Sequence, residues 1–408
     1  MLILKLAWRN IWRNKRRSAL TILAVVFTVW LCVGMRAMQV GTYRSNIEFS
    51  VNMFNGYLQV QKVGFQENQT LTKTFKYTKE IENVIKNNSD ILSYTPRIYA
   101  NGLIGFKDNS VGSIIFGINP EKEKNVTTLY LRVKQGTFLT SNSKYDIVLG
   151  QKMLENLKAK IGDTLVILSS GYDGSMGNLK FRICGTISMG FPEMDNMTAF
   201  INIDAAKELL NMRDRISVIA IKLKSLEFIP IVQMDLKESL NDDNLTVLGW
   251  EELMPDMKES MEFDNVQGLL YVFILLIIVA FGILNTVLMS ITERFKEFGI
   301  MLALGLKHTK LLIIVFFETL FLTFIGIAIG NLIAFFTNYY ITYNPIPYGG
   351  DTSKMMEEYG FLPMMFSTMD LDILVVYSFI TLLTALVVFL YPAYRLYKLE
   401  ALKGIRYT

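Results

Sequence analysis

The chain has 408 residues, of which 51% are hydrophobic and 19% charged, and its net charge is +4. This composition is too apolar for an ordinary soluble protein of this length, and the small net charge argues against nucleic acid as a partner. The chain has one histidine, His308, and two cysteines, Cys32 and Cys184. No spacing among them is typical of a metal site, and a single histidine excludes most histidine-based catalysis. Because one cysteine lies in an apolar stretch and the other in a polar interval, we expect no disulfide between them.

Four apolar stretches are long enough to cross a bilayer, whose core requires about 20 residues of helix. We predict transmembrane helices at 18–42, 266–291, 311–340 and 371–394. Proline at position 392 predicts a kink or the end of the fourth helix. The first stretch has the basic start of a signal peptide, but no small-residue cleavage site follows it, so we expect an uncleaved anchor.

Lysine and arginine are concentrated at one end of these predicted spans. Residues 1–17 carry six basic residues and no acid, and the segments 292–310 and 395–408 are also basic, whereas 341–370 carries a single lysine. The positive-inside rule therefore places both termini and the segment 292–310 in the cytoplasm. The intervals 43–265 and 341–370 are then extracytoplasmic.

The interval 43–265 has the pattern of a folded domain. Strand-like runs punctuated by glycine, proline and asparagine alternate with helix-like runs, and Asp204 is a candidate helix N-cap. We predict strands at 57–61, 112–117, 164–168 and 181–187, and helices at 151–158 and 204–211. The predicted fold class is therefore an α-helical membrane protein with four transmembrane helices and a large α+β extracytoplasmic domain inserted between helices 1 and 2.

Nothing in this domain predicts catalysis. It contains no histidine, and Glu193 and Asp195 favour a solvated loop over an acid/base pair. The segment 136–212 has the pattern of a subdomain inserted into a parent fold. We expect the domain to bind partners and to transmit conformational change.

The segment 290–305 (SITERFKEFGIMLALG) is the most informative stretch. Phe295, Phe298, Met301 and Leu302 recur at helical spacing, which predicts a short amphipathic helix. Such a helix either lies on the membrane or docks into a cytoplasmic partner, and an interfacial segment without a partner is equally open. The glycines here do not form a phosphate-binding loop, because the required Gly-Lys-Ser/Thr ending is missing. If the protein uses ATP, another chain must bind it.

Two motifs resemble FtsX-like ABC transporter permeases, the superfamily of MacB-type macrolide exporters and lipoprotein-releasing (LolC/LolE) permeases. The N-terminal segment 6–17 (LAWRNIWRNKRR) resembles that family's amphipathic helix under the membrane, where Trp8 and Trp12 suit the interface and the arginines suit the headgroups of membrane lipid. The order of one span, a large outer domain and three spans also matches. The second motif resembles the family's coupling helix, and the ATPase-coupling residues it implies are Glu293, Arg294, Glu297, Phe298, Gly299, Ala303 and Gly305.

Segments of the predicted subdomain resemble the lipoprotein-releasing branch in particular. They are 147–151 (IVLGQ), 160–165 (KIGDTL), 181–187 (FRICGTI) and 194–206 (MDNMTAFINIDAA). One permease of that branch captures a periplasmic lipoprotein chaperone with a β-hairpin hook. The corresponding segment 169–180 is shorter and lacks the hook's prolines, so a plain strand connection is the alternative. The hook residues implied are Gly171, Tyr172, Met176 and Gly177.

The resemblance implies a multi-pass permease of the bacterial inner membrane that is not itself an enzyme and binds no cofactor. A cytoplasmic ABC ATPase dimer would supply ATP and Mg²⁺, and a second copy or a related permease would complete a dimer. The expected task is release of lipoproteins towards a periplasmic carrier protein. The alternatives are a MacB-like permease for efflux of peptides, toxins or drugs from the periplasm and an FtsX-like regulatory scaffold.

For lipoprotein release, the acylated substrate would enter between spans one and two of opposite subunits. The gate residues that this implies are Met35, Arg36, Val266 and Leu269. Within the third span, Glu318 is an intramembrane acid, which is functional by default, although its place near the cytoplasmic end favours helix packing. Gly326 and Gly330 form a GxxxG pattern that permits close helix approach.

Overall fold

The computed structural model describes residues 2–190, 192–358 and 361–398. They form two compact units. The helical unit comprises Met1–Tyr43, Ser260–Pro347 and Met364–Thr408, and the α+β unit comprises Arg44–Glu259 and Tyr348–Pro363. The C-terminal part of the predicted cytoplasmic tail, from residue 399 onwards, lies outside the described residues.

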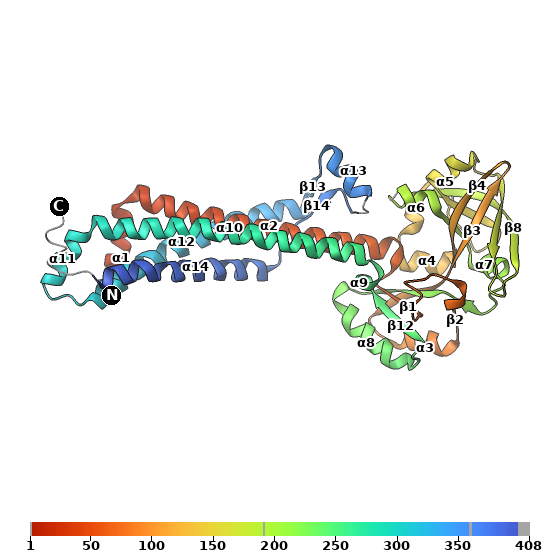
Figure 1. Cartoon of the computed structure of the whole chain (residues 1–408), viewed down its shortest axis with the longest axis horizontal. Coiled ribbons are helices and arrows are strands. Elements are labelled where there is room, and N and C mark those ends of the chain that lie inside the picture. The colour runs from red at the N-terminus through yellow and green to blue at the C-terminus, as the bar shows by residue number, and fades with distance from the viewer. Residues whose placement is uncertain (1, 191, 359–360, 399–408) are drawn as a thin grey trace. The chain divides into compact units, whose positions relative to one another are not determined.

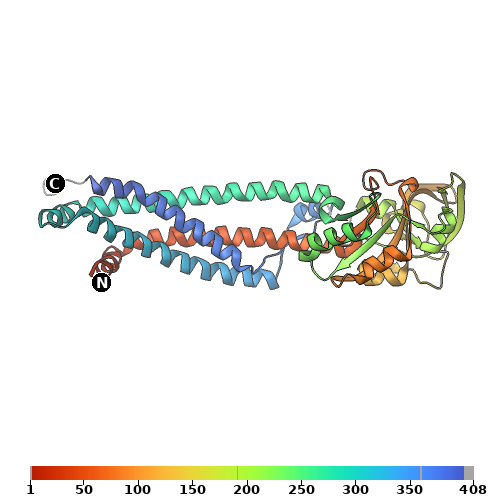
Figure 2. The same cartoon turned by 90° about the horizontal axis from the view of Figure 1, so that it is seen from below.

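Four helices among the described residues are long and apolar enough to cross a membrane. They are α2 (Lys15–Ser50), α10 (Pro255–Glu293), α12 (His308–Tyr343) and α14 (Leu371–Tyr397). Within the helical unit they run side by side (Figures 1 and 2). Each helix extends beyond its apolar stretch at one or both ends, because the backbone ladder continues through polar residues that hydropathy does not count.

The fourth helix does not end at Pro392, and the prediction of a helix end there was wrong. Helix α14 continues to Tyr397 with Pro392 inside it. A proline removes one backbone hydrogen bond, which the packing of a membrane helix against its neighbours tolerates.

The GxxxG pattern packs helix α12 against α2 of the same chain. A Cβ atom on Gly326 would lie 2.6 Å from the Cβ of Val25, and one on Gly330 would lie 2.9 Å from the Cβ of Val29. Only glycine permits this approach, so these two positions fix a helix contact within the subunit.

Short elements complete the helical unit. Helices α1 (Leu2–Arg13) and α11 (Phe295–Ala303) lie at the same end of the helix bundle (Figures 1 and 2). Strands β13 (Ile346–Pro347) and β14 (Met364–Met365) pair with each other.

The α+β unit is built on a ten-stranded sheet with the order β12-β1-β11-β3-β4-β9-β6-β8-β5, to which β7 adds by pairing with β3 and β8. The pairing is antiparallel except for β4 with β9 and β6 with β8. Strands of the predicted subdomain 136–212 join this same sheet. Two further strands, β2 and β10, pair only with each other. The strands of the unit are β1 (Leu58–Lys62), β2 (Phe75–Lys76), β3 (Ile91–Phe106), β4 (Asn109–Ile118), β5 (Val133–Gly136), β6 (Asp146–Gly150), β7 (Thr164–Ser170), β8 (Met176–Ile187), β9 (Thr198–Asn202), β10 (Arg215–Ile216), β11 (Val218–Leu223) and β12 (Leu245–Gly249).

Eight α-helices among the described residues lie wholly within this unit, besides short 3-10 helices. Both helix predictions, at 151–158 and 204–211, correspond to observed helices within one or two residues. The helices are α3 (Lys79–Asn87), α4 (Pro120–Val126), α5 (Gln151–Leu157), α6 (Pro192–Met197), α7 (Ile203–Leu209), α8 (Ile229–Leu240), α9 (Trp250–Leu253) and α13 (Gly350–Glu358).

Two local predictions in this unit were wrong. The N-cap of α7 is Asn202, whose side chain accepts a hydrogen bond from the backbone N–H of Asp204 at 3.0 Å, because the helix follows directly on β9. Asp195 is buried in α6 and accepts hydrogen bonds from the Ser188 hydroxyl and the Met189 backbone N–H, each at 2.7 Å. It therefore anchors a turn and does not belong to a solvated loop.

The core of the α+β unit contains a charged pair. Arg97 on β3 donates from Nε to Glu123 on α4 at 3.1 Å and from Nη2 at 2.7 Å, and both side chains are fully buried. The Thr127 hydroxyl also donates to this carboxylate, at 2.7 Å. The guanidinium carbon lies 4.2 Å from the centre of the Phe54 ring, in a π-helical turn that follows α2. Burial alone would lower the pKa of Arg97, but the neighbouring Glu123 more than offsets it, so the pKa of Arg97 is raised and its guanidinium stays charged.

Candidate functional site

The predicted coupling segment forms a short helix between α10 and α12. Helix α10 ends at Glu293, Arg294 has non-helical backbone angles, and α11 follows from Phe295 to Ala303. After the end of the helix, the N–H of Leu306 donates back to the carbonyl of Met301 at 3.0 Å, and Gly305 has a φ of +90°. This left-handed conformation favours glycine, which accounts for the residue at this position.

Helix α11 presents different residues to the helix bundle and to solvent. Phe298 is fully buried, and Phe295, Met301 and Leu302 pack partly buried against the same core. The predicted apolar face therefore faces the bundle. A second set of apolar side chains faces outward: Leu304 is 82% exposed and Ile300 is 47% exposed. Four residues of the predicted coupling set are also exposed: Glu293, Glu297, Ala303 and Gly305.

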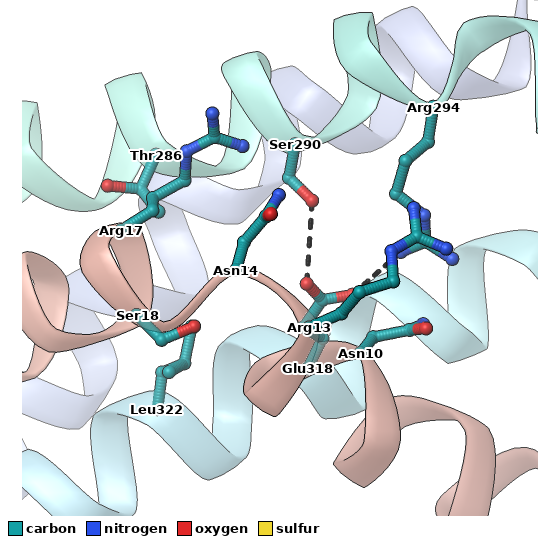
Figure 3. Close-up of a pocket in the computed structure, with 10 residues that line it drawn as sticks. All are labelled: Asn10, Arg13, Asn14, Arg17, Ser18, Thr286, Ser290, Arg294, Glu318 and Leu322. Carbon is teal, nitrogen blue, oxygen red and sulfur yellow. Dashed lines mark hydrogen bonds and ion pairs between the residues drawn. The ribbon is translucent and has the colours of Figure 1, made fainter.

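Arg294 is the centre of an ion-pair network beneath this helix. Its Nη1 atom lies 3.2 Å from Glu318 on α12, and its Nε atom lies 3.2 Å from Glu297. Ser290 on α10 also donates to Glu318, at 3.4 Å (Figure 3). The intramembrane acid thus has a charged partner on the coupling segment, so α10, α11 and α12 are tied together at one point.

Helix α1 and the start of α2 extend the same network. Arg13 lies 2.9 Å from Glu297, and Arg17 forms an ion pair with Glu293, which also accepts a hydrogen bond from Asn14 at 3.2 Å. Burial alone would raise the pKa of Glu297, but its hydrogen bonds from Arg13 and Arg294 lower the pKa, which keeps it ionised. We refer to the pairs Arg13–Glu297 and Arg17–Glu293 as the arginine clasp.

The two arginines of the clasp help to line a small polar cavity of about 20 Å³, which is room for about one water molecule. Figure 3 shows the side chains converging on it from α1, α2, α10 and α12. The residues that line it are Asn10, Arg13, Asn14, Arg17, Ser18, Thr286, Ser290, Arg294, Glu318 and Leu322.

Sequence reasoning did not predict the clasp, although a signal exists. Two arginines four residues apart, Arg13 and Arg17, match two glutamates four residues apart, Glu293 and Glu297. Residues at this spacing lie on one helix face, so two such faces of opposite charge can pair.

A second cavity, of about 220 Å³, lies among helices α2, α10 and α14. It brings together three of the four predicted gate residues, Met35, Arg36 and Leu269, whereas Val266 does not line it. Arg36 donates to the side-chain oxygens of Asn265 at 2.5 Å and Gln39 at 2.6 Å. The other residues that line this cavity are Met38, Gln39, Asp264, Gly268, Tyr271, Val272 and Tyr377.

The segment predicted as a chaperone hook is the β7–β8 hairpin. Its strands pair up to Ser170 and Met176, and its tip is fastened to the segment after α7. The N–H of Tyr172 donates to the carbonyl of Leu210 at 2.7 Å, and Asn211 donates to Asp173 at 2.7 Å. This geometry is that of a short strand connection held against its own domain, with Met176 exposed beside it. A hook function of Gly171, Tyr172, Met176 and Gly177 stays a prediction.

Known proteins with similar sequences match both parts of the chain. Residues 18–239 match the MacB-like periplasmic core domain, and residues 269–401 match the FtsX-like permease C-terminal family. The chain is 27% identical over 353 residues to an uncharacterized ABC transporter permease of Methanocaldococcus jannaschii, covering 81% of this chain and 83% of that one. It is 22% identical over 340 residues to the lipoprotein-releasing system transmembrane protein LolC of Neisseria meningitidis serogroup B, covering 79% and 80%.

A relative with a longer chain is the macrolide export ATP-binding/permease protein MacB of Bdellovibrio bacteriovorus. The identity is 23% over 350 residues, which cover 78% of this chain but 51% of MacB. Together these matches define a membrane-embedded ABC transporter permease. The chain belongs to the family of FtsX-like permeases that carry a MacB-like periplasmic core domain, as the resemblance of its motifs predicted.

Proposed function

We propose that this chain is the transmembrane subunit of an ATP-driven transporter that releases lipoproteins from the bacterial inner membrane towards a periplasmic carrier. Similarity to LolC over four fifths of both chains supports the cargo. The observation that carries the coupling role is the pair of exposed apolar side chains at the end of α11, Ile300 and Leu304, on a segment that begins with the largely buried ion pair of Arg294 and Glu318.

In this proposal the cytoplasmic ATPase dimer binds ATP and Mg²⁺ and contacts α11 through Leu304 and Ile300. An apolar side chain that is mostly exposed in the free chain gains burial when it enters a partner's pocket. Phe298 and Arg294 transmit the movement, because one fills the bundle core and the other joins α11 to α12. Helices α10 and α12 then move with the ATPase.

Replacing Leu304 with aspartate should break the contact with the ATPase while leaving the fold intact, because this side chain is 82% exposed. We expect the ABC ATPase recovered with affinity-tagged protein from native membranes, quantified by mass spectrometry, to fall at least about tenfold, as for loss of an apolar hot spot. The matched control is Leu131→Asp, at a leucine 65% exposed in the α+β unit, which should recover the ATPase in full. Equal recovery with both variants would refute the docking role of α11.

The 220 Å³ cavity is the proposed entrance for the acyl chains of the lipoprotein. Met35, Leu269 and Val272 give it an apolar wall, which suits hydrocarbon, and Arg36 supplies a cation at its side. The residues Met35, Arg36 and Leu269 act as gate residues in this proposal, with Val266 at the lipid-exposed surface next to them.

A photo-crosslinking amino acid at Met35 tests the cargo. We expect a crosslinked adduct with an acylated lipoprotein that increases when the ATPase is inactive, since cargo then stays at the gate. The control position is Val375 on α14, which is exposed but does not line the cavity.

The second candidate function is MacB-like efflux, favoured by the match of residues 18–239 to the MacB-like core domain. An adduct at neither position, together with ATP-dependent export of a periplasmic peptide, would replace lipoprotein release by that function.

A further inference from the structure

A second polar network joins α2 to α10 at the end of the helix bundle opposite the arginine clasp. Arg36 donates to the side-chain oxygen of Asn265 at 2.5 Å. Gln39 donates to the backbone carbonyl and to the carboxylate of Asp264, each at 2.9 Å. Arg36 lies about 30 Å along α2 from Arg17, which belongs to the clasp. The same two helices are therefore held together at two distant points.

Tyr43 completes this network. Its hydroxyl donates to the carboxylate of Asp264 and also lies 3.0 Å from the carbonyl of Met261. In each of these contacts between the two helices, the donor lies on α2 and the acceptor on α10, so all of them are lost together when the helices separate here. We refer to this network as the latch. It comprises Arg36, Gln39 and Tyr43 on α2 with Met261, Asp264 and Asn265 on α10.

Gln39 is the centre of the latch. Its amide oxygen accepts a hydrogen bond from Arg36 at 2.6 Å while its amide nitrogen donates to Asp264, so the amide bridges a cation and an anion. Gly268 on α10 makes room for it. A Cβ atom at this position would lie 2.8 Å from Nε2 of Gln39, which is closer than van der Waals contact. A methyl group added at Gly268 would therefore displace the amide and disturb the latch.

The latch forms part of the wall of the 220 Å³ cavity. Arg36, Gln39 and Asp264 all line this cavity, as does Gly268. Pockets that enclose a drug-sized ligand have volumes of about 300–1,000 Å³, and an acylated lipoprotein is larger than such a ligand. The cavity must therefore widen before it can admit cargo. Widening on the side of the latch separates α2 from α10.

We propose that the latch holds the cargo cavity closed and that its hydrogen bonds break to admit cargo, an inference that rests on the proposed function. Its residues set the distance between the apolar gate residues Met35 on α2 and Leu269 on α10. The side chains that form the latch are half-buried or exposed, so water can replace their hydrogen bonds when the helices separate. The opening is therefore reversible.

The clasp end of the same helices stays together during this movement. There the Thr21 hydroxyl of α2 donates to Thr286 of α10 at 2.8 Å. Gly326 and Gly330 hold the same part of α2 closely against α12. The opening is thus a movement of α10 away from α2 at the latch, with the clasp end as its hinge.

Labelling of a cysteine inside the cavity tests the latch without cargo or ATPase. The full chain, with both native cysteines replaced by serine, carries Val272→Cys at a buried position that lines the cavity. We expect Gly268→Ala to raise the rate of labelling by a small methanethiosulfonate at least about fivefold, the effect of one lost hydrogen bond on an opening equilibrium. The matched control is Gly282→Ala on the same helix. Its Cβ would lie 3.7 Å from the Cβ of Ala24, an ordinary contact, so the rate should not change.

A second variant covers the case in which Gly268→Ala fails to fold. Tyr43→Phe removes a donor of the latch without adding an atom, and it should also accelerate labelling. Equal rates in the parent chain, Gly268→Ala and Tyr43→Phe overturn the latch. Equal acceleration by Gly268→Ala and Gly282→Ala overturns it as well, since any added methyl group would then loosen the two helices.

A disulfide across the latch tests its role in cargo release. Oxidised Gln39→Cys/Gly268→Cys, in complex with the ATPase, should not release acylated lipoprotein, and a reductant should restore release. The control is oxidised Ala24→Cys/Gly282→Cys, whose Cβ separation of 3.7 Å suits a disulfide and which joins the same helices away from the latch, so release should continue. Release by the oxidised latch pair overturns the proposal. If both reduced pairs fail to release lipoprotein, the proposed function is contradicted, and the labelling rates still decide whether the latch closes the cavity.

Discussion

Replacing Arg97 with methionine should destabilise the α+β unit by about 3–5 kcal/mol, the usual cost of leaving one member of a buried ion pair without its partner. The variant leaves the carboxylate of Glu123 buried with only Thr127 as a side-chain hydrogen-bond donor. It also removes the cation from the ring of Phe54, in the turn that follows α2. The loss is large because neither Arg97 nor Glu123 can reach water without opening the core.

The thiol of Cys184 in the α+β unit provides the measurement. Burial raises its pKa to about 12, so the folded unit holds it protonated at pH 8, whereas an unfolded cysteine near pKa 8.5 is roughly a thousandfold more ionised. In full-length protein with Cys32→Ser, maleimide labelling over a denaturant series therefore reports unfolding. Arg97→Met should shift the midpoint strongly to lower denaturant.

Two further variants make this expectation specific. Like Arg97, Arg182 donates two hydrogen bonds to one carboxylate, that of Asp146, each at 3.1 Å. Its side chain is 61% exposed, however, so we expect Arg182→Met to lower the free energy of unfolding by at most about 1 kcal/mol. Arg97→Met/Glu123→Leu removes both charges and should recover most of the stability. If Arg97→Met lost no more stability than Arg182→Met, the buried pair would not stabilise the fold.

The buried pair also shows where sequence reasoning reached its limit. Hydropathy located all four apolar helices, because an uninterrupted run of about 20 apolar residues is typical of a membrane-spanning helix and rare in soluble domains. Arg97 stands within a strand, and nothing near it in the sequence distinguishes a buried arginine from an exposed one. Its partner is 26 residues away on another element, so only the folded sheet brings them together.

The candidate site was predictable in part for the same reason. Local spacing identified α11 and its apolar side, because Phe295 and Phe298 repeat within one helix. It did not predict that this side packs against the helix bundle of the same chain, since the pattern of an amphipathic helix does not say what covers its apolar side. The clasp depends on tertiary structure, since Arg13 and Glu297 are 284 residues apart. Asp195 was misjudged because a carboxylate in a short polar segment resembles a surface loop, and only the fold shows the two donors that it satisfies.

The second large effect is expected at Arg294. Replacing it with methionine removes the contacts at 3.2 Å to Glu318 and Glu297 together. Glu318, whose side chain is 13% exposed, then keeps the hydrogen bond from Ser290 at 3.4 Å but has lost its cation. We expect the helical unit to lose about 2–4 kcal/mol, somewhat less than for a fully enclosed pair. ATP hydrolysis should continue while cargo release falls at least about tenfold, because α11 no longer moves α12.

Cys32 on α2 reports this change, since it is buried in the bundle and becomes the only thiol in a Cys184→Ser background. Arg294→Met should expose Cys32 to maleimide at a lower temperature than the parent chain. Arg294→Met/Glu318→Leu removes both charges, so we expect its stability to return while cargo release stays low, because the link between α11 and α12 is still missing. If the double variant restored release as well, the ion pair would serve stability alone and the coupling movement would have to pass through the buried contact of Phe298.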